Sequence, residues 1–241
     1  MKKFVTVAAA IAAFGFVNAA SAADMSTKAP IVKAPLTVPY NWTGCYIGGD
    51  VGYAWGRDSD SERVTATGAA SPFSPPGTAS PDGVKAGGYL GCNWQTSVFV
   101  FGLEGDAEWA NLKGSTPFNV PAPADFYETT IKSQESIRGR VGYAMDRVLF
   151  YATGGVAFAN INEHDQVGAT GAFTNNSTRR TGWTLGAGVD YAFTGNWIGR
   201  IEYRYADFGT FSYVPTVFAA FTENHKVTEN AIRFGLAYKF W

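Results

Sequence analysis

Hydrophobic and polar residues alternate with a period of two in eight separate segments between about residue 44 and the end of the chain. In one of them, Phe99, Phe101 and Leu103 share a face. Glu104 and Asp106 share the opposite face. Successive side chains of a β-strand point to opposite faces, so each segment predicts a strand with one apolar and one polar side. The evidence is weak in one segment and strong when it recurs eight times.

The connections between these segments alternate between long and short. Short connections are expected at Gln95–Ser97, about Met145–Val148, and Thr194–Asn196. Long ones are expected at about Arg57–Asp82, Leu112–Thr130, Asn160–Arg180 and Asp207–Val227. Outer-membrane barrels have short periplasmic turns and long extracellular loops, and this alternation matches them. We therefore predict an all-β fold, an eight-stranded antiparallel transmembrane up-and-down β-barrel.

Composition and the N-terminus support an exported membrane protein. Charged residues are 16% of the chain and aromatic residues 15%, whereas soluble domains are about 25% charged. Lys2 and Lys3, the apolar run from Phe4 to Val17 and the site Ala20-Ser21-Ala22 predict a Sec-type signal peptide over residues 1–22. The proline-containing residues 23–40 are expected to form a periplasmic lead-in, and residues 41–241 the barrel. No basic block suggests a nucleic-acid partner.

A soluble lipocalin-type barrel is the competing fold, with its apolar face turned inward around a ligand. Two observations count against it. The long connections all fall at one end, and aromatic residues gather at strand ends, as in the interfacial girdles of membrane proteins. These aromatic residues are Trp55, Trp94, Trp109, Tyr143, Trp197 and Tyr205.

The polar strand faces place charged residues in the predicted lumen. They are Asp50, Lys85, Glu104, Asp106, Glu108, Arg138, Arg140, Asp190, Arg200, Glu202, Arg204, Arg233 and Lys239. An eight-stranded barrel is just wide enough for side chains to fill it. Buried charges are stable when paired, so a salt-bridged plug is expected. A narrow ion path is the alternative.

Catalytic and metal chemistry is not expected, and no cofactor is implied. His164 and His225 both fall in predicted surface loops. His164, with its acidic neighbours Glu163 and Asp165, is the one candidate for a metal or haem contact. The sequence shows no catalytic Ser-His-Asp order and no Cys-His metal spacing.

Cys45 and Cys92 are predicted to form a disulfide. If Cys45 lies opposite Cys92, then Ile47 faces Leu90, and every following outward residue of the first hairpin also meets an outward partner. Directly opposed antiparallel residues are about 4.5 or 5.5 Å apart at Cα, within or near the bridgeable range. Exported proteins also meet an oxidising environment.

Several motifs resemble the small porin-like outer-membrane proteins of α-proteobacteria, the outer-membrane immunogenic protein family. The motifs are WTGCYIGG from Trp42, GGYLGCNWQ from Gly87, SIRGRVGY from Ser136, YATGGVA from Tyr151, GWTLGAGV from Gly182 and RFGLAYKF from Arg233. The resemblance implies the same eight-stranded barrel, an abundant surface-exposed structural role, and no catalytic residues. In this chain Trp241 follows the usual terminal aromatic, and cysteines stand where the resemblance leads us to expect aromatic residues.

The predicted function is therefore a structural outer-membrane barrel with surface-exposed loops. A small diffusion channel and a loop-borne receptor, such as one for haem, are the alternatives. Expected partners are outer-membrane lipid and lipopolysaccharide, and the barrel assembly machinery during biogenesis. That machinery is expected to read a C-terminal signal made of Phe234, Leu236, Tyr238, Phe240 and Trp241.

Overall fold

The alternating segments form the strands of one sheet. The computed structural model describes residues 39–70, 78–117, 126–166, 171–214 and 219–240. Eight long strands follow one another: β1 (Gly44–Val64), β3 (Asp82–Thr96), β4 (Phe99–Pro117), β5 (Phe126–Met145), β6 (Val148–Gln166), β7 (Phe173–Ala192), β8 (Trp197–Tyr213) and β9 (Phe221–Lys239). A two-residue strand, β2 (Thr78–Ala79), pairs with β1.

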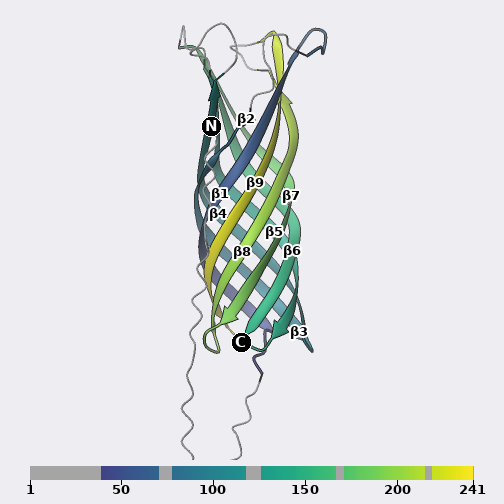
Figure 1. Ribbon diagram of the computed structural model, residues 1–241, viewed down its shortest axis with the longest axis vertical. Coiled ribbons are helices and arrows are strands. Elements are labelled where there is room, and N and C mark those ends of the chain that lie inside the picture. The colour runs from purple at the N-terminus through teal and green to yellow at the C-terminus, as the bar shows by residue number, and fades with distance from the viewer. Residues whose placement is uncertain (1–38, 71–77, 118–125, 167–170, 215–218, 241) are drawn as a thin grey trace, which may run out of the picture. The chain divides into compact units, whose positions relative to one another are not determined.

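The sheet closes on itself. Each long strand pairs antiparallel with the next along the chain, and β1 also pairs with β9, so the eight strands form a tilted ring (Figure 1). Closure gives every long strand a paired neighbour on both sides. The predicted eight-stranded antiparallel barrel is confirmed. No helix among the described residues is long and apolar enough to span a membrane. The predicted signal peptide and nearly all of the lead-in lie outside the described residues.

The outer surface carries a band of exposed apolar side chains. Ile47, Leu103, Ile137 and Phe234 are each at least half exposed, and Trp109 is 78% exposed. A continuous apolar surface of this kind faces lipid in a transmembrane barrel. The faces assigned from the sequence, apolar outward and charged inward, are therefore confirmed.

The strands continue beyond this band. Above the pair Trp55 and Asn230, the outward partners are polar, as in Arg57 opposite Thr228 and Ser59 opposite Lys226. The lipid-facing band therefore ends near Trp55. We call this side of the barrel the loop end, and the side with the short connections the turn end.

The bounds predicted for the long loops were wrong. The strands reach far into all four: β1 runs to Val64, and β9 begins at Phe221. Beyond the band the outward side chains are polar as well, so the contrast that marks a strand in the sequence weakens although the hydrogen-bonded ladder goes on. The three short turns lie within two residues of their predicted bounds, the first at 97–98 and not at Gln95–Ser97. Ser97 and Asp146 adopt positive φ in two of them.

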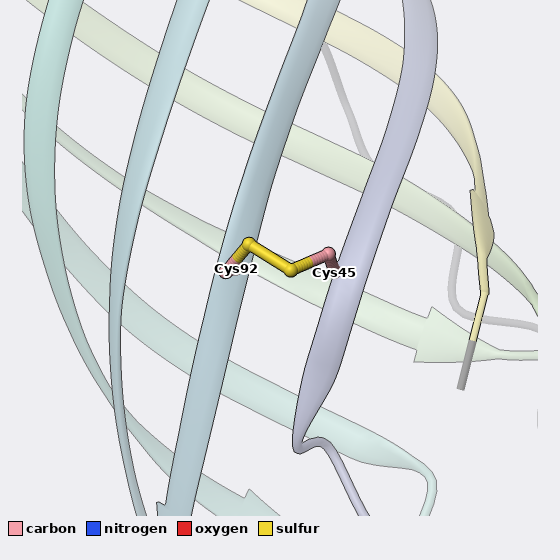
Figure 2. Close-up of a disulfide and its surroundings, with 2 residues drawn as sticks. All are labelled: Cys45 and Cys92. Atoms are coloured by element: carbon pink, nitrogen blue, oxygen red, sulfur yellow. A yellow bond between two sulfur atoms is a disulfide. The ribbon is translucent and has the colours of Figure 1, made fainter.

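The first hairpin has the predicted register. Cys45 lies opposite Cys92, Ile47 opposite Leu90, and Tyr53 opposite Val84. The structure joins Cys45 to Cys92 by a disulfide between β1 and β3, with the two Cα atoms 4.0 Å apart (Figure 2). The bridge lies near the turn end of the barrel, away from the long connection between β1 and β3.

Candidate functional site

The lumen holds a connected network of buried ion pairs. Twelve of the thirteen charged residues predicted to point inward take part: Asp50, Lys85, Glu104, Asp106, Glu108, Arg138, Arg140, Asp190, Arg200, Glu202, Arg204 and Arg233. The strand period of two turns them all to one side of the sheet. Glu229 of β9 joins them through Lys85 and was not predicted.

Arginines and acids interlock on the turn side of the network. Arg140 lies 2.8 Å from Asp190, which Arg200 also contacts at 2.9 Å. Arg200 reaches Glu104 at 2.6 Å. The Tyr46 hydroxyl donates to Glu104 at 2.7 Å and accepts from Arg140 at 2.8 Å. The phenol therefore links two ion pairs.

The middle of the network joins strands on opposite sides of the ring. Glu202 accepts from Arg138 at 2.8 Å and from Arg233 at 2.9 Å. Arg204 lies 2.6 Å from Asp106. Since β5 and β8 are not neighbours in the sheet, the pair between Arg138 and Glu202 crosses the lumen.

The loop side of the network is centred on Lys85 and Glu108. The Lys85 ammonium lies 2.8 Å from Glu229 and 2.9 Å from Glu108. Arg233 contacts Glu108 at 3.0 Å and also pairs with Asp50. Six bases thus meet seven carboxylates, and their side chains are at most 3% exposed.

This arrangement does not resemble an acid–base catalytic pair. Glu104 and Asp106 each contact at least two arginines, and these fix both carboxylates as acceptors. Buried charges are stable when they are paired and hydrogen-bonded on several sides. The geometry therefore favours a structural plug.

Lys239 lies apart from the network in which it was predicted. Its ammonium donates to the Asn41 carbonyl and lies 4.4 Å from the centroid of the Tyr40 ring. Lys239 sits at the turn end, below the other charges. No carboxylate pairs with it in the part of the chain that the structure describes.

Apolar side chains pack inside the barrel on both sides of the charges. At the turn end, Trp42 is fully buried, and its indole nitrogen donates to the Asp146 carbonyl at 2.9 Å. Inward residues of six strands lie in the same cluster: Val100, Ala144, Leu149, Ala192, Ile198 and Ala237. Toward the loop end, a second cluster includes Leu112, Ile131, Ile161, Phe208, Phe211 and Val227. The charged network is therefore enclosed between two apolar layers.

A second polar cluster lies on the loop side of the second apolar layer. The prediction that His225 lies in a surface loop was wrong. His225 belongs to β9 and is fully buried. Its Nδ1 lies 3.0 Å from Asp58, and its Nε2 lies 3.3 Å from Glu223 and 3.8 Å from Asp60. Thr129 lies beside it and donates to Asp58 at 2.6 Å.

The cluster around His225 lies beyond the lipid-facing band. Burial and neighbouring charges shift the pKa values of its side chains. Burial lowers the pKa of the His225 imidazole, but hydrogen bonds to Asp58 and Glu223 outweigh it, so the pKa is raised well above its usual value. Burial raises the pKa of Asp60 to about 7, although attraction to His225 opposes the rise.

His164 also lies in a strand and not in a loop. It belongs to β6, where its Nδ1 lies 2.6 Å from the Asn175 side-chain oxygen and its ring lies 5.6 Å from that of Phe173. Two groups in the described residues have metal-ligand spacing, and both contain His225 and not His164.

Sequence reasoning missed the acids around His225 because they fell in predicted loops. A signal was present: Asp58 and Asp60 are two apart, as are Glu223 and His225. The same spacing in a strand places both members of each pair on one face. Without an apolar opposite face, this alternation does not stand out from an ordinary polar loop.

The sequence comparisons agree on one family, and a solved structure shares the fold. The sequence profile of the outer membrane protein beta-barrel domain matches residues 8–240. The chain is 34% identical to the 25 kDa outer-membrane immunogenic protein of Brucella abortus, covering 100% of this chain and 99% of the relative. It is also 34% identical to the 31 kDa outer-membrane immunogenic protein of Brucella melitensis, covering 97% and 98%. Among solved structures, the outer membrane protein OprG of Pseudomonas aeruginosa matches with a TM-score of 0.57 at 14% identity, covering 83% and 98%.

Proposed function

This chain belongs to the outer membrane protein beta-barrel domain family, and on that basis we propose that it is a structural barrel with a closed lumen that displays loops at the cell surface. Family membership places it in the outer membrane of a Gram-negative bacterium. In the proposed orientation the turn end faces the periplasm and the loop end faces outward, as in other outer-membrane barrels. Residues 1–22 would act as the export signal.

One observation carries the closed lumen: a connected set of buried ion pairs fills it from wall to wall. Arg138 of β5 reaches Glu202 of β8 across the lumen, and Arg200 of β8 reaches Glu104 of β4. Each arginine contacts more than one acid, so a passing ion would have to break several contacts in a low-dielectric interior. The apolar layers above and below would add two dry barriers.

The loop end is the proposed site of surface contact. The curated relatives are named as immunogenic outer-membrane proteins, and a surface-antigen role for this chain follows by analogy. Loops on a rigid scaffold are where binding usually takes place. The lipid-facing band would contact outer-membrane lipid, and the strands above it lipopolysaccharide.

The last strand is the proposed contact with the assembly machinery. Phe234, Leu236, Tyr238 and Phe240 all point outward and are at least 39% exposed. They form one apolar row to which the assembly machinery can bind before the barrel closes. Trp241 lies outside the described residues.

Liposome swelling tests the closed lumen. Purified folded protein is reconstituted into liposomes loaded with an impermeant polymer and diluted into isosmotic arabinose, with a general diffusion porin as the positive control. The proposal predicts swelling no faster than in protein-free liposomes. Swelling that scales with the amount of folded protein would favour the diffusion channel.

A further inference from the structure

His225 belongs to the last strand, β9, and lies where β9 pairs with the first strand, β1, to close the barrel. Asp60 of β1 is its direct partner across the β1–β9 pairing. Asp58 and Glu223 lie two residues away from this pair along β1 and β9, so all four side chains point to the same inward side. Asp60 lies four residues from the loop end of β1 at Val64.

Among the residues that the structure describes, this cluster gathers three acids around one base. Asp58, Asp60 and Glu223 are each at most 2% exposed. In the described part of the chain, the recorded ion pairs of these three carboxylates all go to His225. When all three carboxyl groups are ionised, a single imidazolium does not balance them, so the site is suited to a further positive charge.

Within the described residues, two buried carboxylate oxygen atoms of the cluster have no hydrogen-bond partner. They are Oδ1 of Asp60 and Oε1 of Glu223. Asp60 Oδ1 is also the atom that faces His225 Nε2 at 3.8 Å. A buried carboxylate oxygen with no donor is costly, and a cation bound between the two strands would satisfy it.

Asp58 holds the imidazole in the orientation that a metal ligand needs. It faces His225 Nδ1 at 3.0 Å, while Nε2 faces Asp60 and Glu223. Histidines that bind metals usually donate their other ring N–H to a carboxylate, which fixes the tautomer and the ring orientation. Phe211 stacks on the ring, with centroids 5.5 Å apart, and further restricts its rotation.

We propose that Asp60, Glu223 and His225 bind a divalent transition-metal ion of the zinc class at the loop end of the barrel, with Asp58 as a positioning residue. One ligand atom from each of Asp60, Glu223 and His225 can be chosen so that all three lie within 4.8 Å of one another. Two ligand atoms of one tetrahedral zinc ion lie about 3.4 Å apart, close to the 3.3 and 3.8 Å that separate His225 Nε2 from Glu223 and Asp60.

The ligand types select the class of ion. Imidazole suits zinc, copper, iron and nickel, whereas calcium and magnesium prefer sites built only of oxygen. Three protein ligands, one nitrogen and two carboxylates, leave a fourth tetrahedral position for water. This inference does not depend on whether the lumen conducts.

Metal titration tests the site. The folded full-length barrel in detergent micelles is stripped with a chelator and titrated with Zn²⁺ in competition with a chromophoric chelator. We expect one ion per chain, no displacement by a hundredfold excess of Mg²⁺ or Ca²⁺, and tetrahedral d–d absorption bands with Co²⁺. His225→Ala should weaken binding at least a hundredfold. Asp58→Asn should weaken it 10- to 100-fold with unchanged stoichiometry.

His164→Ala is the matched control, because it removes a histidine of β6 that belongs to neither group with metal-ligand spacing. Its zinc affinity should equal that of the parent. Equal affinity in His225→Ala and the parent would overturn the proposal, as would the absence of zinc binding by the folded parent. If His225→Ala does not fold, Asp60→Asn and Glu223→Gln take its place. Unchanged affinity in both would also overturn it.

Discussion

Arg138 and Glu202 meet across the barrel lumen, with a guanidinium nitrogen 2.8 Å from a carboxylate oxygen and both side chains fully buried. Arg138 also contacts Glu104 and Asp106. One side chain therefore ties β5 to β4 and to the far wall formed by β8. The network acts as the core that a soluble protein would build from apolar groups.

Removing this arginine should strongly destabilise the barrel. Arg138→Met leaves buried carboxylates without a partner, and we expect it to lower the free energy of unfolding by about 3–5 kcal/mol. The matched control is Arg179→Met, whose partner is Glu135 at 3.0 Å and whose own side chain is 60% exposed. That substitution should change stability by less than about 1 kcal/mol. Urea unfolding followed by tryptophan fluorescence measures both, and equal losses would contradict a buried network.

Gly91 should not tolerate a methyl group. A Cβ there would lie 2.6 Å from the Tyr46 hydroxyl and 2.7 Å from the Leu103 carbonyl oxygen. Gly91→Ala must displace the phenol that links Glu104 to Arg140, and we expect a loss of about 1–3 kcal/mol. Gly195→Ala is the control, because a Cβ at Gly195 meets nothing within 4 Å. Unfolding midpoints that are the same for the two variants would show that Tyr46 is not held as described.

Trp42 should stabilise the turn end without acting as a gate. Trp42→Ala removes a fully buried side chain, and we expect it to cost about 3–5 kcal/mol. The charged network behind it would still fill the lumen, so membrane conductance should stay at background. A variant that is as stable as the parent would contradict the burial of Trp42. A conducting variant would mean that the tryptophan is the main seal.

The two cysteines should be oxidised in protein recovered from the cell envelope. The bridge closes a chain separation of 47 residues, and it should contribute about 2–4 kcal/mol. Alkylation in denaturant without reductant should find no free thiol, and two after reduction. The double variant Cys45→Ser, Cys92→Ser should fold and unfold at lower urea. Two free thiols in the unreduced protein would contradict the bridge.

The sequence was sufficient to predict the fold because lipid imposes a simple rule on every strand. Residues such as Leu103 and Ile137 must be apolar, and their neighbours Glu104 and Arg138 face a filled interior. The hairpin register followed from the same rule, since a slip of one residue would turn Ile47 inward.

The parts that the sequence did not predict lie outside the range of that rule. Glu229 and His225 lie beyond the lipid-facing band, where strand and loop have similar composition. The ion-pair partners of each arginine come from strands that are distant in the sequence and meet across the lumen. Lys239 is on the inward face of its strand, as predicted, but it lies at the turn end, outside the network. The alternation of apolar and polar residues predicts which side of the sheet a side chain faces, but not the side chain with which it pairs.

Single-channel recording tests the central claim most directly. Folded protein is added to a planar lipid bilayer in 1 M KCl, and its insertion is verified by recovery of the heat-modifiable form from the membrane. A lumen filled by the Arg138–Glu202 network predicts a baseline without steady conductance steps over a range of applied voltages. Reproducible, stable steps from the unmodified protein would contradict a closed barrel and identify it as a channel.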